Sequence, residues 1–245
     1  MQMIKKIIRD LFEQHGFVTG GDIHKNDRAG ALHRAWGHVF TNHLKGDYLE
    51  FGVYYGDSFI ESYKQYQGFR RWLKRQLNSP ESWRREVAEK FIGFEATFHG
   101  MDTFGGMPKN NEGNAIFAEG TFMSDFNLVY SKCKIAWGGG VGSFKLYQGL
   151  FKDTASELKL NINEKAAIIN IDCDIYESTC DALNISATWI QVGSVLLFDD
   201  YNCYCADNSK GERKAFLEFL ENTKFQFEKW FTYQYAGQAY LCVAE

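Results

Sequence analysis

Short apolar runs alternate with amphipathic segments along this chain, and this alternation predicts an α/β fold. The clearest run is 166–171, which is apolar except for Asn170 and therefore indicates a strand buried on both faces of a sheet. Further strands are expected at 48–53, 94–101, 144–147 and 192–198, with a terminal strand pair near Phe231 and Tyr240. We expect one domain over 1–245.

Amphipathic periodicity places helices between these strands. They are expected at about 57–66, across 183–190 and at 212–220. Ser178-Thr-Cys-Asp181 matches the Ser/Thr-x-x-Asp/Glu pattern of helix N-termini, so the helix across 183–190 should open there. The N-terminal region, 1–45, is expected to be helical, because 1–17 repeats apolar residues at helical spacing among charges, unlike a signal peptide.

A basic segment at 67–92 separates the first of these helices from the second strand. Its seven Lys and Arg residues are mixed with Trp72 and Trp83, and Asn78-Ser-Pro80 interrupts the helical pattern. We therefore expect an inserted helical hairpin. Two interpretations stay open. In the first, the hairpin is a solvated decoration of the domain. In the second, it is a lid or a subunit contact of a homo-oligomer, and its basic residues attract an anionic substrate.

The composition of the chain limits the kinds of partner that we expect it to bind. The formal net charge of -4 gives no reason to expect nucleic acid or an anionic membrane. No apolar run reaches the ~18 residues of a membrane span, so a cytoplasmic protein is the default expectation. Of the six cysteines, Cys203 and Cys205 flank a single tyrosine, which is not the spacing of a structural zinc pair, and reduced, packed thiols are expected.

Several expected strands end in acids, and in open α/β sheets ligands collect at the carboxyl ends of the strands. After the first strand, Gly52 and Gly56 are spaced Gly-x-x-x-Gly. That spacing lacks the middle glycine with which Gly-x-Gly-x-x-Gly admits a pyrophosphate, so it suits a cofactor without phosphates, such as S-adenosylmethionine. Glu50 could accept hydrogen bonds from a cofactor amine or order the loop, and Asp102 could accept two from ribose hydroxyls.

Asp172, Asp199 and Asp200 are the most informative acids. Asp172 ends one apolar run and Asp199-Asp200 end the next, so adjacent strands would bring the three carboxylates together. At about 4 Å and an effective dielectric of ~20, each pair would repel by several kcal/mol. Either a carboxylate takes up a proton or a cation sits among them, and all-oxygen ligands favour Mg²⁺, Ca²⁺ or Mn²⁺. The alternative is a capped turn that faces water.

Four segments together resemble the macrocin O-methyltransferase (TylF-like) family: Glu50-Phe-Gly-Val-Tyr-Tyr-Gly, Met101-Asp-Thr-Phe-Gly-Gly-Met-Pro108, Ile171-Asp-Cys-Asp-Ile-Tyr-Glu-Ser-Thr179 and Phe198-Asp-Asp-Tyr201. The resemblance runs in order over most of the chain. It implies a Rossmann-like class I methyltransferase sheet of seven strands, mostly parallel with an antiparallel C-terminal strand, and helices on both faces. It also implies an enzyme that methylates hydroxyls of small molecules, such as sugars of natural products, with S-adenosylmethionine and Mg²⁺. The segment 67–92 is longer than usual in the family, which leaves the acceptor open.

By this resemblance, Asp172, Asp199 and Asp200 are the implied metal ligands. The implied cofactor-binding positions are Glu50, Phe51, Gly52, Val53, Tyr54, Gly56, Ser58, Asp102 and Thr103. Because the sulfonium methyl is already electrophilic, the protein has to align the acceptor oxygen and help to remove its proton, and Asp172 is the first candidate for that base. Two alternatives stay open: a metal-independent N- or C-methyltransferase of the same fold, and a non-catalytic Rossmann-like nucleotide-binding protein.

Overall fold

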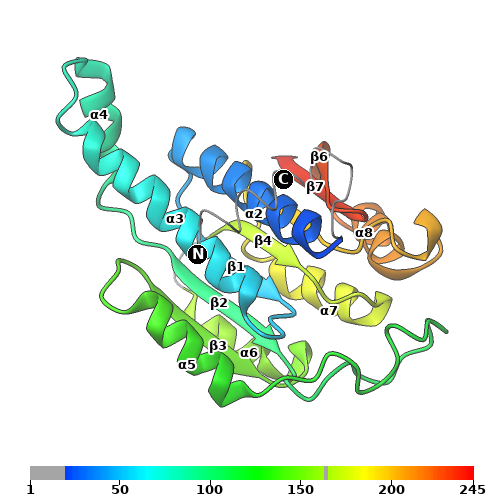
Figure 1. Ribbon diagram of the computed structural model, residues 1–245. Coiled ribbons are helices and arrows are strands. Elements are labelled where there is room, and N and C mark those ends of the chain that lie inside the picture. The colour runs from blue at the N-terminus through cyan, green and yellow to red at the C-terminus, as the bar shows by residue number, and fades with distance from the viewer. Residues whose placement is uncertain (1–19, 163–164) are drawn as a thin grey trace, which may run out of the picture.

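The protein is described by a computed structural model that covers residues 20–162 and 165–245 (Figure 1). The helix expected at 1–17 lies outside the described residues. A seven-stranded sheet in the order β3-β2-β1-β4-β5-β7-β6 forms the centre of the domain. Its strands are β1 (Asp47–Phe51), β2 (Thr97–Asp102), β3 (Ser143–Gln148), β4 (Ala166–Ile171), β5 (Val195–Phe198), β6 (Gln226–Tyr233) and β7 (Gly237–Ala244).

The sheet is parallel from β3 to β5, whereas β7 runs antiparallel to both of its neighbours, β5 and β6. The expected mostly parallel sheet with an antiparallel C-terminal strand is therefore confirmed. Every residue of β4 is buried, as its continuous apolar run predicts. The strand order reverses between β1 and β4, and ligands of open α/β sheets bind outside the carboxyl ends of the strands at such a point.

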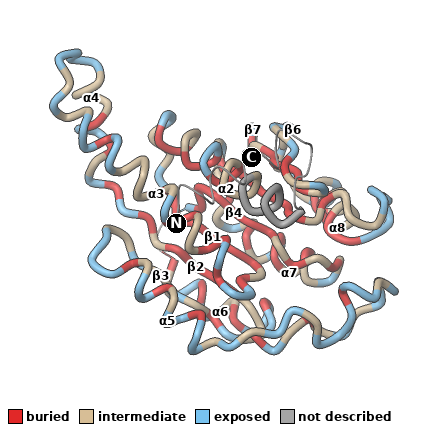
Figure 2. The backbone as a smooth tube through the Cα atoms, in the orientation of Figure 1, coloured by how far each residue is buried: buried red, intermediate tan, exposed pale blue. Residues whose placement is uncertain are grey.

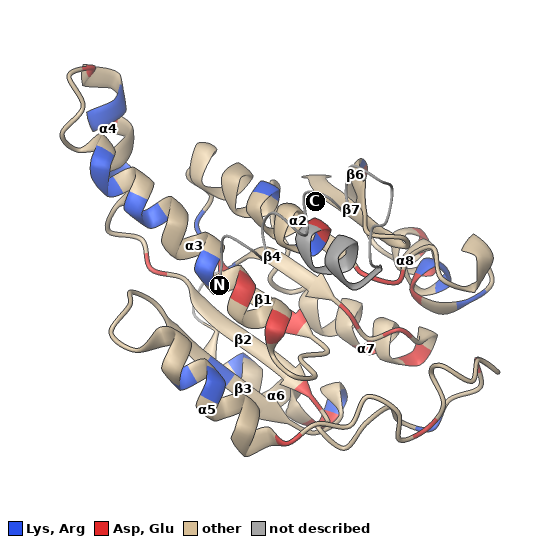
Figure 3. Ribbon diagram, viewed as in Figure 1, with Lys and Arg blue, Asp and Glu red and all other residues tan. Residues whose placement is uncertain are grey.

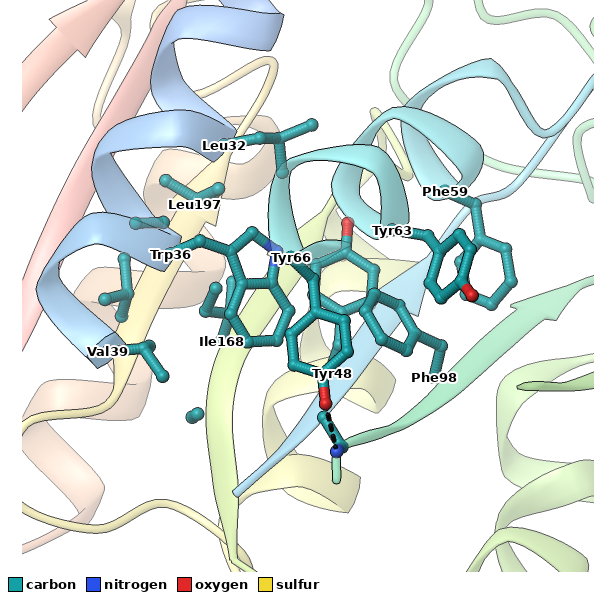
Figure 4. Packing of buried hydrophobic residues seen from close by; sticks show 14 of the residues in the cluster. Leu32, Trp36, Val39, Tyr48, Phe59, Tyr63, Tyr66, Phe98, Ile168 and Leu197 are labelled. Carbon is teal, nitrogen blue, oxygen red and sulfur yellow. Dashed lines mark hydrogen bonds between the residues drawn. The ribbon is translucent and has the colours of Figure 1, made fainter. Parts of the chain in front are cut away.

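Helices cover both faces of the sheet, so that the buried strands in Figure 2 lie between two hydrophobic layers. The helices are α2 (Gly20–Thr41), α3 (Asp57–Gln76), α4 (Ser82–Phe91), α5 (Phe126–Trp137), α6 (Phe151–Asn161), α7 (Tyr176–Ser186) and α8 (Gly211–Asn222). Trp36 of α2 anchors the first layer; its ring centroid lies 5.0 Å from that of Tyr66 and 5.6 Å from that of Phe98 (Figure 4). The second layer packs α6, α7 and α8 on the other face.

Several expected boundaries differ from the structure, and two of these differences have a clear physical reason. The fifth strand begins at Val195 rather than at 192, because Gly193 turns with a φ of 93° and donates its N–H to Cys242 O at 2.8 Å. The helix expected to open at Ser178 opens at Tyr176, whose N–H donates to Glu112 Oε1 at 2.7 Å. A side chain from a distant loop therefore caps this helix in place of the local sequence motif.

The segment 67–92 comprises the second half of α3, a turn at 77–81 and α4. It projects from one end of the domain as a helical hairpin (Figure 1), and its root is packed because Leu73, Ala88 and Phe91 belong to the first hydrophobic layer. Trp72 and Trp83 remain exposed. Neither this hairpin nor any other helix of the described residues is both long and apolar enough to cross a lipid bilayer.

Candidate active site

A cavity of about 910 Å³ opens at the carboxyl ends of β1, β2, β4 and β5. The floor of the cavity is formed by the residues that directly follow β4 and β5. The backbone hydrogen bonds of the sheet continue to these residues. Asp172 donates its N–H to the last residue of β1 at 2.9 Å, and Asp199 donates to the last residue of β4 at 3.0 Å. The backbone thus fixes where both side chains leave the sheet.

Gly52 begins the turn between β1 and α3 and has a φ of 93°. A Cβ at this position would lie 1.8 Å from the carbonyl oxygen of Asp172, so the glycine is required by the close approach of two neighbouring strand ends. Gly56, with a φ of 79°, precedes α3, and a Cβ there would lie 3.0 Å from Val129 Cγ1 of α5. Gly52 lines the cavity, whereas Gly56 serves the packing of α3 on α5.

Asp102 holds two loops with its carboxylate. Its Oδ2 accepts the N–H groups of Val53 at 2.8 Å and Tyr54 at 2.7 Å, and its Oδ1 accepts that of Phe104 at 2.6 Å. A carboxylate has about four acceptor positions, so these three bonds leave about one for a ribose hydroxyl. Asp102 therefore shapes the loop after β1 as well as lining the cavity.

Glu50 is fully buried and lies below the cavity wall rather than in it. Burial raises the pKa of Glu50 to about 7, although hydrogen bonds from Tyr48 and Ser58 oppose the shift. Ser58 Oγ donates to Glu50 Oε1 at 2.7 Å, and Ser58 itself lines the cavity. Of the two roles expected for Glu50, this geometry favours ordering the loop over contact with a cofactor amine.

The expected cofactor positions thus divide into two groups. Those that line the cavity are Gly52, Val53, Tyr54, Ser58, Asp102 and Thr103. The others, Glu50, Phe51 and Gly56, lie behind this lining and support it.

The three expected metal ligands meet at the ends of β4 and β5. Asp172, Asp199 and Asp200 all line the cavity, and one carboxylate oxygen from each lies within 4.8 Å of the other two. Gln234 Nε2 donates to Asp199 Oδ1, and Cys203 Sγ donates to Asp200 Oδ1 at 3.1 Å. The cluster offers only oxygen donors beside an open cavity, which fits Mg²⁺.

Sequence reasoning missed Arg28, a cation of α2 that reaches this cluster. Its Nη1 lies 3.1 Å from Asp172 Oδ2, and its Nη2 donates to Asp199 Oδ2. Burial lowers the pKa of Arg28, but the charges of Asp172 and Asp199 outweigh this effect and raise it, so the guanidinium stays charged. Burial and the neighbouring Asp199 and Asp200 raise the pKa of Asp172, and Arg28 opposes that shift.

Two further acids belong to the site and were also missed. Asp174 lines the cavity with a φ of 64°, and burial and the charge of Asp200 raise its pKa. The Asp-x-Asp spacing from Asp172 could have indicated it. Glu212, in the first turn of α8, is fully buried and accepts the N–H of Asp200 at 3.0 Å on Oε2, while its Oε1 has no hydrogen-bond partner among the described residues. Nothing in the local sequence signals Glu212.

The loop between β2 and α5 closes one side of the cavity with apolar side chains. Met107, Pro108, Ile116, Phe117 and Phe122 line the cavity from this loop. Met107 and Phe117 pack on Ile175, and Glu112 caps α7, so the loop spans from the end of β2 to the start of α7.

Fold and site together define a class I methyltransferase. A family model described as macrocin-O-methyltransferase (TylF) matches residues 95–225, more than half of the chain. The protein therefore belongs to the TylF macrocin O-methyltransferase family and is an S-adenosylmethionine-dependent O-methyltransferase. Family membership excludes the non-catalytic nucleotide-binding alternative.

Solved structures share the fold. The O-methyltransferase NovP has a TM-score of 0.63 and 19% identity, over 89% of this chain and 80% of NovP. The calicheamicin methyltransferase CalS11 has a TM-score of 0.58 and 18% identity, over 89% of this chain and 79% of that one. The O-methyltransferase TomG from Streptomyces achromogenes, involved in tomaymycin synthesis and solved with S-adenosylmethionine, has a TM-score of 0.52 and 10% identity, over 88% and 80%. A comparison with curated protein sequences gives no match.

Proposed function

We propose that this enzyme transfers the methyl group of S-adenosylmethionine to a hydroxyl of a small molecule, such as a sugar or another natural product, with the assistance of Mg²⁺. The proposal is based mainly on the clustering of Asp172, Asp199 and Asp200 at one side of an open cavity. The other wall of this cavity is the loop after β1, along which the cofactor would lie. An alcohol is a poor nucleophile at neutral pH, so the site has to orient the oxygen of the acceptor hydroxyl and help to remove its proton.

The cofactor would lie along the loop after β1. The backbone at Gly52 and Val53 borders the cavity without a bulky side chain, and Asp102 retains about one acceptor position for the ribose. Tyr54 and Thr103 would complete the same wall.

The carboxylate cluster would hold the ion. Mg²⁺ takes few protein ligands and keeps several waters, so three carboxylates leave room for an acceptor hydroxyl. When bound, the ion supplies a Lewis acid that lowers the pKa of the hydroxyl and orients it. Gln234 and Cys203 fix the rotamers of Asp199 and Asp200 through their hydrogen bonds.

The proton would pass to a carboxylate of the same cavity. Asp172 is the first candidate, as the sequence suggests. Asp174 is a second candidate, since it lines the cavity two residues further on and is not one of the three clustered carboxylates.

A small natural product suits the remaining wall. Met107, Phe117 and Phe122 offer an apolar surface opposite an acidic edge, which favours an acceptor with one apolar face and several hydroxyls. CalS11 and TomG are named for calicheamicin and tomaymycin, which supports this class of acceptor.

The test is a screen of hydroxylated acceptors with labelled S-adenosylmethionine, run with Mg²⁺ and with excess chelator. We expect transfer to a hydroxyl that the chelator abolishes and Mg²⁺ restores. Transfer at the full rate in chelator would favour the metal-independent alternative, and a product labelled at nitrogen or carbon would contradict the acceptor chemistry.

A further inference from the structure

Arg28 contacts carboxylate oxygens of two of the three proposed metal ligands. Its guanidinium pairs with Oδ2 of Asp172 and with Oδ2 of Asp199, while Asp199 Oδ1 accepts from Gln234. Both oxygens of Asp199 are thus already engaged. A divalent cation on either shared oxygen would place two positive groups side by side, which is repulsive even in a partly solvated site.

The guanidinium is held by the two carboxylates. Among the described residues, its Nη atoms contact Asp172 and Asp199, and its Nε has no hydrogen-bond partner. Arg28 also lines the cavity, which gives the side chain space to withdraw.

The same part of α2 is tied to the turn between β6 and β7. Asp27 Oδ2 accepts the N–H of Gln234 at 2.7 Å, and the side chain of Gln234 donates to Asp199. A change at the carboxylates is therefore linked by direct contacts to α2 and to this turn.

From this arrangement we propose that Arg28 is a resident counter-ion, which neutralises the carboxylate cluster of the metal-free enzyme and competes with the divalent cation for Asp172 and Asp199. Cation binding then releases α2 around Arg28 from the cluster. The inference rests on the proposed metal site. It predicts that the wild-type enzyme binds its cation more weakly than its carboxylates alone would allow.

The first test measures the affinity of the full-length protein for Mn²⁺ alone, by the paramagnetic resonance of free Mn²⁺ and by calorimetry. Arg28→Gln should bind Mn²⁺ at least about tenfold more tightly than wild type, and Arg28→Lys, which keeps the charge with one donor group, should lie between them. Lys64→Gln removes the same charge from the cavity wall without contacting these carboxylates, so it should change the affinity much less. Arg34→Gln, on the exposed side of α2, should change nothing.

The second test follows hydrogen exchange of the backbone amides of α2. Saturating Mn²⁺ should speed exchange around residues 27–34 in the wild type, whereas Arg28→Gln should exchange at the faster rate with and without the ion. Thermal unfolding in excess chelator adds a third reading. Arg28→Gln should melt below the wild type in chelator and gain more from added Mn²⁺.

The outcomes separate this inference from the metal proposal. If Arg28→Gln binds Mn²⁺ as the wild type does or more weakly, or if Lys64→Gln gains as much, Arg28 is not a competitor, although the metal site stands. If exchange of α2 in the wild type ignores saturating Mn²⁺, the release is wrong. If no variant binds Mn²⁺ and methyl transfer persists in chelator, the metal proposal fails and takes the competition with it.

Discussion

The two ends of α3 carry opposite charges in opposite settings. Its N-terminal end borders an acidic cavity in which Asp172, Asp199 and Asp200 follow strand ends. Its C-terminal end enters the hairpin, where Lys and Arg residues gather along α3 and α4 (Figure 3). At the acidic end each of the three aspartates donates its backbone N–H to a fixed acceptor, and its carboxylate contacts a neighbouring side chain. At the basic end, contacts such as the Arg84–Glu81 ion pair are local and exposed.

This difference shows which charges the fold constrains. The parallel strands β1, β2, β4 and β5 all have their carboxyl ends on the same side of the sheet. Acids that follow these strands therefore lie close together, however far apart they are in sequence. The hairpin has no such constraint beyond its packed root. No residue of 67–92 lines the cavity, and decoration, a lid and a subunit contact all stay predictions for the hairpin.

The largest expected effect is at the acidic end. Asp199→Asn should lower kcat/KM by roughly 10²-fold or more, since a lost Lewis acid is worth several kcal/mol of transition-state stabilisation. Affinity for S-adenosylhomocysteine, measured by calorimetry, should change little. The matched control is Glu86→Gln in the exposed hairpin, which should leave both values unchanged. Full activity of Asp199→Asn in Mg²⁺ would show that this carboxylate is not a ligand.

Backbone geometry gives the next effect. Gly52→Ala places a Cβ against the carbonyl oxygen of Asp172 and forces a residue with a side chain into a φ of 93°. The free energy of unfolding should fall by about 2 kcal/mol or more, with cofactor affinity falling as well. Gly93→Ala, beside the hairpin root with open space around it, should stay within about 0.5 kcal/mol of wild type. Equal melting temperatures of the two variants would contradict the close approach.

Some features of the fold and site follow from sequence and others do not. The cluster of Asp172, Asp199 and Asp200 was predictable because these acids follow the ends of β4 and β5, and the two strands are neighbours in the sheet. Arg28 was not, because a helix residue reaches the cluster only once α2 is docked on the sheet. Glu112 at the start of α7 is missed for the same reason, since its capping contact spans distant loops.

Gly52 and Gly56 also show how tertiary packing changes an interpretation made from sequence. The sequence assigns Gly52 and Gly56 to the cofactor, because small residues after a first strand admit a ligand. The structure gives each a neighbour within the protein, the carbonyl of Asp172 for one and Val129 for the other. A glycine in the sequence indicates that the backbone can adopt a positive φ there. Which neighbouring atom makes that φ necessary depends on tertiary packing, which the periodicity of the sequence does not specify.

Buried Glu50 makes stability depend on pH in a way that exposed acids do not. Its pKa is raised from 4.5 to about 7, so over that interval the folded protein holds a proton that the unfolded chain has released. The free energy of unfolding should therefore fall as pH rises through this window, by up to about 3 kcal/mol. Urea unfolding at about pH 5 and about pH 7.5 measures the fall, and Glu50→Gln should reduce it. An unchanged pH dependence in the variant would exclude Glu50 as its source.

Asp102→Ala should have a smaller and more specific effect. It removes the acceptor of three backbone N–H groups and the remaining acceptor position for the ribose. Affinity for S-adenosylhomocysteine should fall by roughly 1.5–3 kcal/mol, the scale of hydrogen bonds to a charged group. Asp102→Asn keeps one oxygen acceptor and should lose less. Calorimetry that finds a difference below a few tenths of a kcal/mol for Asp102→Ala would remove Asp102 from the ribose site.

The smallest effect is expected at Trp83, at the tip of the hairpin. Trp83 is 60% exposed and contacts the guanidinium of Arg84 at 5.1 Å from the ring centroid. Because Trp83 belongs to neither hydrophobic layer and does not line the cavity, Trp83→Ser should change stability by no more than about 0.5 kcal/mol and leave kcat and KM within about twofold. Light scattering of wild type and variant decides what the tip does. An assembly that Trp83→Ser dissociates would make the hairpin a subunit contact, while a changed KM at constant mass would favour the lid interpretation.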